Sequence, residues 1–178
     1  SMTYIRYGSE TWNTLRDNAD IKIGGAYGAF SPNPAPVGDS LRCDVANRNN
    51  WGEPGRFGLV TNYIRGCRNY FPIIYYDGDL ELQSNGRGQG ILMVNGDLRI
   101  RGTFDFYGLI IVKDDIERAS GTMNIFGSVM SRNVRMVDMG SILTGTQNIN
   151  FSTCAVESAL RGSAILVQVR ERGWAQLF

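Results

Sequence analysis

Histidine is absent from the 178 residues of this chain. That absence removes the commonest general base, a frequent metal ligand, and the partner of serine or cysteine in nucleophilic pairs. The three cysteines, Cys43, Cys67 and Cys154, are too few and too scattered for a zinc knuckle. The composition therefore argues against the commonest hydrolase and metal chemistries, and no residue pattern indicates a cofactor.

Charge of one sign and long apolar runs are also lacking. With 18 basic and 17 acidic residues the net charge is +1, and the arginines are spread along the chain. There is thus no electrostatic case for binding nucleic acid or an anionic membrane surface. No stretch approaches the ~18 apolar residues of a membrane span, and no signal peptide is visible. Because Ser1-Met2 resembles a tag remnant, we expect the natural protein to extend upstream.

What the chain does contain is a repeat of 18 or 19 residues between Ile73 and Gly145. Each unit opens with an apolar run, which is weaker in the fourth, turns at a polar pair, continues with an apolar strand and closes on glycine. The four units are 73–90, 91–108, 109–127 and 128–145. A fixed period over several units is typical of a solenoid, in which no unit buries its apolar face alone.

The spacing inside each unit indicates which solenoid. Apolar residues occur in pairs two apart, which is strand alternation, and successive pairs lie six apart, which gives three sides per coil. The inward residues predicted for the second unit are Leu92, Val94, Leu98, Ile100, Phe104 and Phe106. Stacked coils ~4.8 Å apart would align these residues in apolar ladders. The sequence therefore predicts an all-β fold, a single-stranded parallel β-helix with at least four coils.

Both the fold and its handedness have alternative interpretations. An antiparallel sandwich would also show short strands, with hairpin turns at Gly78-Asp79 and Gly96-Asp97. The β-helix is favoured because a sandwich has no reason to repeat the same three-sided spacing. A left-handed coil also fits 18 residues, but the small residue that it usually has at a fixed hexad position is missing, so we predict a right-handed one.

Outside the repeat we predict two further regions. Residues 1–72 are an irregular N-terminal region packed on the solenoid, with a short helix at Ser9–Asn18, a strand at Asp20–Ile23, and an ordered proline-rich loop over 31–58, disorder being the alternative. The solenoid itself spans 73–151. Residues 152–178 form a helix from Cys154 to about Arg161 that caps the open end, and an apolar tail that packs back or forms an interaction patch.

Asp79, Asp97 and Asp115 occupy one column on three successive units. Stacked carboxylates of this kind occur in β-helical polysaccharide lyases and hydrolases, where they bind calcium or act as acid and base. The alternative, which we favour, is that aspartate is preferred at a corner facing water. The column stops at Asn133. Any aromatic residues of the coil that face outward could stack on a carbohydrate or a peptide.

Two more motifs have structural alternatives. The glycine-rich segment Gly86–Gly90 lacks the lysine of a phosphate loop and is better explained as a side where backbones pack closely. Cys43 and Cys67 bracket the proline-rich loop, and a bond between them would stabilise the fold by about 3 kcal/mol. The alternative is two buried free thiols. Cys154, at the start of the predicted helix, is expected to be buried.

Six separated motifs, in order over about residues 43–178, resemble the C-terminal soluble region of bacterial PilX-type (type IV) pilus assembly proteins. They are Asn50-Trp-Gly-Glu-Pro54; Cys67-Arg-Asn-Tyr-Phe-Pro-Ile-Ile-Tyr75 with Gly78-Asp-Leu80; Arg87-Gly-Gln-Gly-Ile-Leu-Met-Val94 with Gly96-Asp-Leu98; Phe106-Tyr-Gly-Leu-Ile-Ile-Val112; Ser152-Thr-Cys-Ala155; and Arg170-Glu-Arg-Gly-Trp174 with Leu177-Phe178. One departure is Lys113-Asp-Asp115, where a glycine-containing turn is common.

The resemblance implies an exported domain at the cell envelope or surface, tethered to the membrane by a hydrophobic N-terminal helix upstream of residue 1. It implies other pilus or pilus-assembly proteins as partners, it makes a Cys43–Cys67 disulfide plausible, and it transfers no catalytic residue. We therefore expect a non-enzymatic domain acting in pilus assembly or adhesion. The alternatives are a bactofilin-like polymer of stacked solenoids and a carbohydrate-active β-helix that uses the Asp79, Asp97 and Asp115 column.

Overall fold

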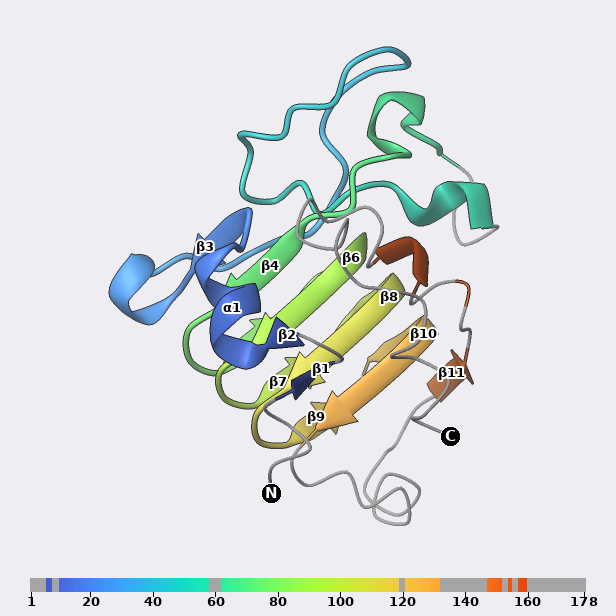
Figure 1. Ribbon diagram of the computed structural model, residues 1–178. Helices are drawn as coiled ribbons and strands as arrows, with labels where there is room; N and C mark the ends of the chain where they lie inside the picture. The colour runs from blue at the N-terminus through green and yellow to red at the C-terminus, as the bar shows by residue number, and fades with distance from the viewer. Residues whose placement is uncertain are drawn as a thin grey trace.

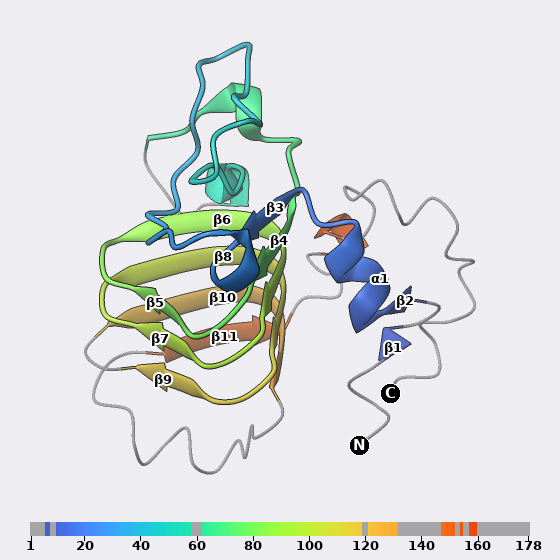
Figure 2. The same cartoon turned by 90° about the vertical axis from the view of Figure 1, so that its left-hand side faces the viewer.

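The chain between Ile73 and Ser131 winds as a coil whose successive turns stack through parallel strands (Figure 1). The computed structural model describes residues 6–7, 10–57, 62–118, 121–131, 147–151, 154 and 157–159. The strands form a six-stranded sheet in the order β11-β10-β8-β6-β4-β3 and a three-stranded sheet in the order β5-β7-β9. The predicted all-β parallel β-helix is confirmed, and Figures 1 and 2 show that the coil winds to the right.

The strands and helices have the following bounds. The N-terminal region contains β1 (Arg6–Tyr7), β2 (Glu10–Thr11), α1 (Trp12–Asp17), β3 (Ile21–Ile23) and three short 3₁₀ helices, η2 (Gly25–Tyr27), η3 (Pro54–Phe57) and η4 (Arg65–Cys67). The coil contains β4 (Ile73–Tyr76), β5 (Leu80–Leu82), β6 (Gly86–Val94), β7 (Leu98–Ile100), β8 (Thr103–Val112), β9 (Ile116–Arg118), β10 (Thr122–Ser131) and β11 (Gln147–Phe151).

Three glycines in one column let the long strands turn a corner. Gly90, Gly108 and Gly127 are aligned in register in the middle of β6, β8 and β10. Their φ angles are 105°, 140° and 143°, in a region that side chains rarely adopt. A Cβ on Gly108 would collide with the Gly90 carbonyl, and one on Gly127 with the Gly108 carbonyl. The glycine that closes each unit is therefore required both by the turn and by the stacking.

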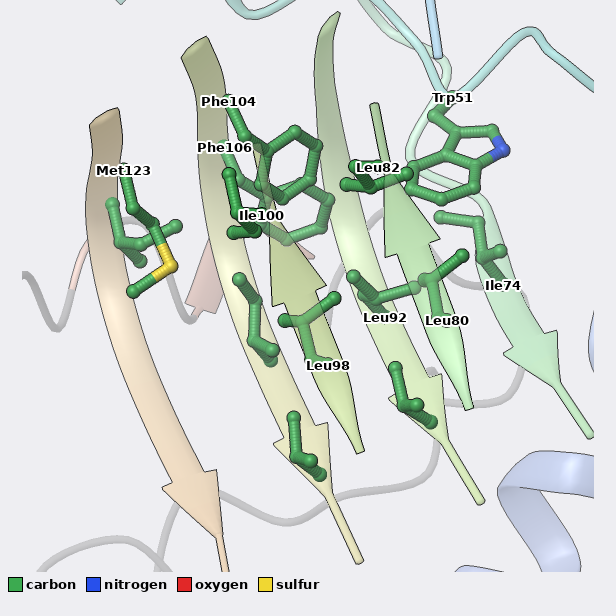
Figure 3. Close-up of a cluster of buried hydrophobic side chains, with 14 of the residues drawn as sticks. Trp51, Ile74, Leu80, Leu82, Leu92, Leu98, Ile100, Phe104, Phe106 and Met123 are labelled. Carbon is green, nitrogen blue, oxygen red and sulfur yellow. The ribbon is translucent and has the colours of Figure 1, made fainter. Parts of the chain in front are cut away.

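The interior of the coil matches the predicted ladders. The main cluster of buried side chains contains Ile74, Leu80, Leu82, Leu92, Val94, Leu98, Ile100, Phe104, Phe106, Ile110, Val112, Met123 and Ile125 (Figure 3). Each alternates with an outward residue, as the burial pattern of β5 and β7 shows. All six inward residues predicted for the second unit are 0% exposed.

A second apolar cluster lies outside the coil. Outward residues of the side formed by β4, β6 and β8 pack against Leu15 of α1 and against Ala159. These outward residues are Ile73, Tyr75, Ile91, Met93, Leu109 and Ile111. Since this side is buried on both faces, its strands are continuous apolar runs, as in other parallel sheets covered on both faces. The predicted N-terminal helix is confirmed as α1, and the structure shows that it covers this flank. Its proposed cap, Ser9, lies outside the described residues.

The fourth unit departs from the prediction. The offset between paired residues is 18 from β7 to β9 and 19 from β8 to β10, so the extra residue falls in the corner between β9 and β10. From β10 to β11 the partner of Gly127 is Phe151, an offset of 24, so Gly145 does not close a fourth unit. The described residues make about three turns rather than at least four, and β11 adds one more strand to one side.

The C-terminal helical residues do not lie where the sequence predicts. Residues 154 and 157–159 are helical, but Ala159 packs in the flank cluster with Ile91 and Leu109. The Ala159 Cβ lies 3.0 Å from where a Cβ on Gly108 would stand. The described part of this helix thus packs on the apolar flank of the coil. The tail beyond it lies outside the described residues.

Candidate functional site

The N-terminal end of the coil is covered by the cap, which we define as residues 28–57 and 62–72. In Figures 1 and 2 the cap stands above β4 and β6. β3, just before it, pairs in parallel with β4. On β6, the Arg87 amide donates to the Pro34 carbonyl at 3.0 Å and the Gln89 amide donates to the Trp51 carbonyl at 2.7 Å. The cap therefore satisfies backbone groups at an edge that a solenoid would otherwise expose.

Trp51 anchors the cap in the coil. It is 0% exposed and belongs to the interior cluster, where its ring meets the Phe104 ring edge-to-face at 6.2 Å between centroids (Figure 3). Its indole N–H donates to the Arg48 carbonyl at 3.0 Å. Gly88 leaves room for this ring, because a Cβ there would lie 2.7 Å from the Trp51 Cβ. The glycine-rich side predicted to pack closely is confirmed, and its neighbour is the cap.

A buried polar contact fixes the same junction. Arg87 Nε donates to the Glu53 carboxylate at 2.9 Å, and Arg87 Nη2 donates to the Asn62 carbonyl at 2.8 Å. The Glu53 side chain is fully buried, and this burial raises the pKa of its carboxyl above the ordinary value, while the Arg87 guanidinium opposes the rise. The side-chain amide of Gln89 (Nε2) donates to the carbonyls of Arg68 and Tyr70 at 3.1 and 2.8 Å.

A disulfide closes the cap on itself. Cys43 and Cys67 are bonded, with their Cα atoms 4.8 Å apart, which confirms the predicted disulfide. Beside them, the buried Asn50 side chain donates to the carbonyls of Asp44 and Val37 at 2.7 and 3.1 Å. The motif Asn50–Pro54 is thus joined at one end to the disulfide loops and at the other to Arg87–Gly90. Two motifs that lie far apart in sequence form one contact.

The disulfide brings two loops together around a groove. Its volume is about 410 Å³, and it is lined by Ser40, Leu41, Arg65, Gly66, Arg68 and Asn69. Leu41 is 88% exposed, the most exposed large apolar residue in the described part of the chain. Sequence reasoning missed this groove, because its walls lie more than 20 residues apart and only the disulfide signals that they meet.

The aspartate column exists, and its oxygens are hydrogen-bonded to the backbone. The Asp97 amide donates to Asp79 Oδ1 at 2.8 Å, and the Asp115 amide donates to Asp97 Oδ1 at 2.8 Å. Each of the first two carboxylates therefore caps the corner of the next coil. Asn85 repeats the device one corner later by accepting from the Thr103 amide at 2.8 Å. These contacts are what a structural role of the column requires.

An alternating charge ladder occupies the adjacent side of the coil. Glu81, Arg99 and Glu117 are aligned in register on β5, β7 and β9. Arg99 bridges Glu117 at 2.7 Å and Glu81 at 3.6 Å, and Arg101 bridges Glu81 at 2.9 Å. A hydrogen bond from Arg101 lowers the pKa of Glu81. These side chains are between 31% and 47% exposed, so solvent screens the ladder and it contributes little to stability.

The remaining predictions concern single residues and metals. Cys154 is exposed with a free thiol, so the expectation that it is buried is wrong. Ala159, further along the chain, is the residue that packs in the flank cluster. Within the described ranges, no group of three histidine, cysteine, aspartate or glutamate residues could hold a metal ion. No helix among the described residues is long and apolar enough to cross a membrane.

Comparison of this sequence with protein-family models, curated proteins and solved structures finds no match.

Proposed function

We propose that this chain is a non-enzymatic β-helical domain of an exported, membrane-anchored surface protein that acts in type IV pilus assembly or adhesion. The observation that carries the proposal is the cap, in which two of the motifs that resemble PilX-type proteins contact each other. Glu53 of the first motif pairs with Arg87 of the third, and Trp51 packs on Gly88. These motifs thus hold a surface loop in one conformation, as expected of a protein whose work is recognition.

The disulfide supports the exported part of the proposal. Cys43–Cys67 links two loops at the periphery of the fold, and such bonds form and persist in oxidising compartments such as the periplasm and the cell surface. In a reducing cytosol the same pair would be held as thiols. The bond therefore favours the envelope over the cytoplasm.

A polymer of stacked solenoids is the second candidate, and the cap argues against it. End-to-end stacking needs free strand edges at both ends of the coil. At the N-terminal end β3 covers β4, while Pro34 and Trp51 accept hydrogen bonds from β6. Within the described part of the chain, the strands left without a partner on the outer edge at that end are β3 and β5, which have three residues each.

A carbohydrate-active enzyme is the third candidate. It would use Asp79, Asp97 and Asp115, but Asp79 and Asp97 accept hydrogen bonds from the backbone of the next coil. Replacing all three residues with asparagine and assaying a panel of polysaccharides tests this idea. Activity that is present in the wild type and lost in the triple variant would revive it.

The test of the favoured function is a crosslinking pull-down of the full-length tagged protein from its native cells, with an untagged strain as control. Recovery of pilins or pilus-assembly proteins would support the proposal and name the partner. Recovery of only its own copies would favour the polymer, and electron microscopy for filaments would follow. A full-length protein found soluble in the cytoplasm would contradict the proposal.

A further inference from the structure

We propose that the groove between the two disulfide-linked loops of the cap binds an acidic segment of a partner protein, with Arg65 and Arg68 pairing with its carboxylates and Leu41 packing against an apolar residue beside them. The inference names where and by what chemistry a partner binds, and so it rests on the proposed function of the domain as a recognition module.

The distribution of charge in the cap favours an acidic ligand. Each acidic residue of the described cap is already engaged: Asp39 accepts from the Leu41 and Arg42 amides at 2.7 and 2.8 Å, and Asp44 accepts from the Ala46 amide at 3.1 Å. The third, Glu53, is buried against Arg87.

The arginines of the groove, in contrast, have no acidic partner among the residues that the structure describes. Arg65 and Arg68 are exposed, and neither makes a salt bridge within the described part of the chain. The groove therefore presents two guanidinium groups, whose planar donors match carboxylates.

The two walls of the groove are held rigidly in place. Within one wall of the groove the Asp39 amide donates to the Arg42 carbonyl at 2.9 Å. Between the two walls the Gly66 amide donates to the Asp39 carbonyl at 2.9 Å. The Cys43–Cys67 bond joins them covalently. A Cβ on Gly66 would lie 2.5 Å from the Arg42 carbonyl oxygen, so only glycine permits this approach. A groove fixed before binding loses little conformational entropy when a ligand enters.

The residues that line the groove favour a peptide ligand over a sugar. None of the six residues that line the groove is aromatic, so a sugar ring has no surface on which to stack. Leu41, at 88% exposure, instead offers a branched apolar side chain next to the two arginines. An exposed leucine beside two arginines that form no salt bridge with any described residue is complementary to a segment that alternates acidic and aliphatic residues.

The first test pans a random peptide display library against the purified domain. We expect selected peptides enriched in aspartate or glutamate beside aliphatic residues. Arg65→Glu and Arg68→Glu should each weaken their binding at least about tenfold, as should raising NaCl from about 50 to about 300 mM. Arg42→Glu is the matched control: it makes the same charge change in the other disulfide-linked loop of the cap, at a residue that does not line the groove, and it should weaken binding less than about threefold.

Three results would overturn the inference: selected peptides without acidic enrichment, equal losses in all three variants, or binding of oligogalacturonate that depends on Arg65 and Arg68 without any acidic peptide. The last would assign the groove to an acidic sugar.

The second test separates the groove from the proposed function. A photo-crosslinking amino acid is placed at Leu41, or at the exposed Gln83 on the coil as control, in the full-length protein in native cells. Capture of another protein through an acidic segment from position 41 alone supports the inference. Capture from position 83 alone overturns the groove and leaves the proposed function standing. Capture from neither position, together with a pull-down that recovers no other protein, overturns both.

Discussion

Gly88 is where the cap and the coil come closest, and it offers the sharpest test of their junction. An alanine there would place its Cβ 2.7 Å from the Trp51 Cβ, beside a fully buried ring that cannot move without leaving the interior. We expect Gly88→Ala to lower the free energy of unfolding by about 1–3 kcal/mol, measured by urea denaturation. The exposed change Gln83→Ala should stay within about 0.5 kcal/mol of the wild type. Equal midpoints for both variants would mean that Trp51 is not seated as described.

Glu53 is expected to give the cap a distinctive pH dependence. Burial raises the folded-state pKa of its carboxyl above the unfolded value of 4.5, so the folded state binds this proton more tightly. Its contribution to stability is fully present below pH 4.5 and is lost as pH rises through the raised pKa. Because Glu53→Gln cannot ionise, the stability of the variant relative to the wild type should improve between about pH 4 and about pH 7 in denaturation series.

The control is Glu81→Gln, for which the opposite sign is expected. Hydrogen bonding to Arg101 lowers the pKa of Glu81, so its contribution is present above 4.5 and is lost as pH falls through the lowered pKa. That variant should therefore lose stability relative to the wild type as pH rises, by a small amount because the group is exposed. If the Glu53→Gln difference were flat or ran the same way as Glu81→Gln, burial would not dominate at Glu53.

Among the structural elements, the corners of the coil are held by the aspartate column. Asp97 Oδ1 accepts the Asp115 amide, and an asparagine oxygen can accept the same bond, whereas alanine cannot. We expect Asp97→Ala to lower the free energy of unfolding by about 1 kcal/mol and Asp97→Asn to leave it nearly unchanged, both measured by thermal or urea unfolding. Equal losses in the two variants would show that the negative charge, not the accepted hydrogen bond, matters at this corner.

The sequence predicts the coil well because each side of it is a local pattern. Pairs such as Leu98 and Ile100 alternate in burial over three residues, and the glycine column recurs every 18 or 19 residues. The prediction of a fourth unit ending at Gly145 was wrong. Gly145 falls at the expected spacing, but the strand that pairs with β10 begins only at Gln147. The additional residues between β10 and β11 leave no trace in the alternation of the preceding units, so the spacing alone cannot reveal them.

The candidate site was predictable only in part, for a related reason. The motifs around Trp51 and Gly88 stand out in the sequence, but their mutual contact is a tertiary fact that no local pattern encodes. The groove depends on Leu41 and Arg65 meeting across the disulfide, and neither belongs to a periodic segment. Irregular loops lack the repeating burial on which sequence-based prediction depends.

For the whole molecule, the disulfide determines how firmly the cap closes the coil. The bond spans 24 residues, and removing such a constraint on the unfolded chain should cost about 3 kcal/mol. We expect Cys43→Ser with Cys67→Ser to lower the unfolding free energy by about that amount. Hydrogen exchange should show the amides of the cap, with Gln89 beneath them, losing protection before the coil does. Uniform loss of protection over cap and coil would mean that they unfold as one unit.

The same variant should reveal why the coil has a cap at all. When the cap opens, the Arg87 and Gln89 amides lose their acceptors at Pro34 and Trp51, and the end of β6 becomes an unpaired edge able to pair with another chain. We expect the double variant to associate with rising concentration in light scattering after size exclusion, while the wild type does not. Both proteins should carry Cys154→Ser, since that exposed thiol could crosslink copies and mimic association. A double variant that stays as dispersed as the wild type would mean that the disulfide does not control access to this edge, whereas filaments of the wild type would show that the cap permits stacking.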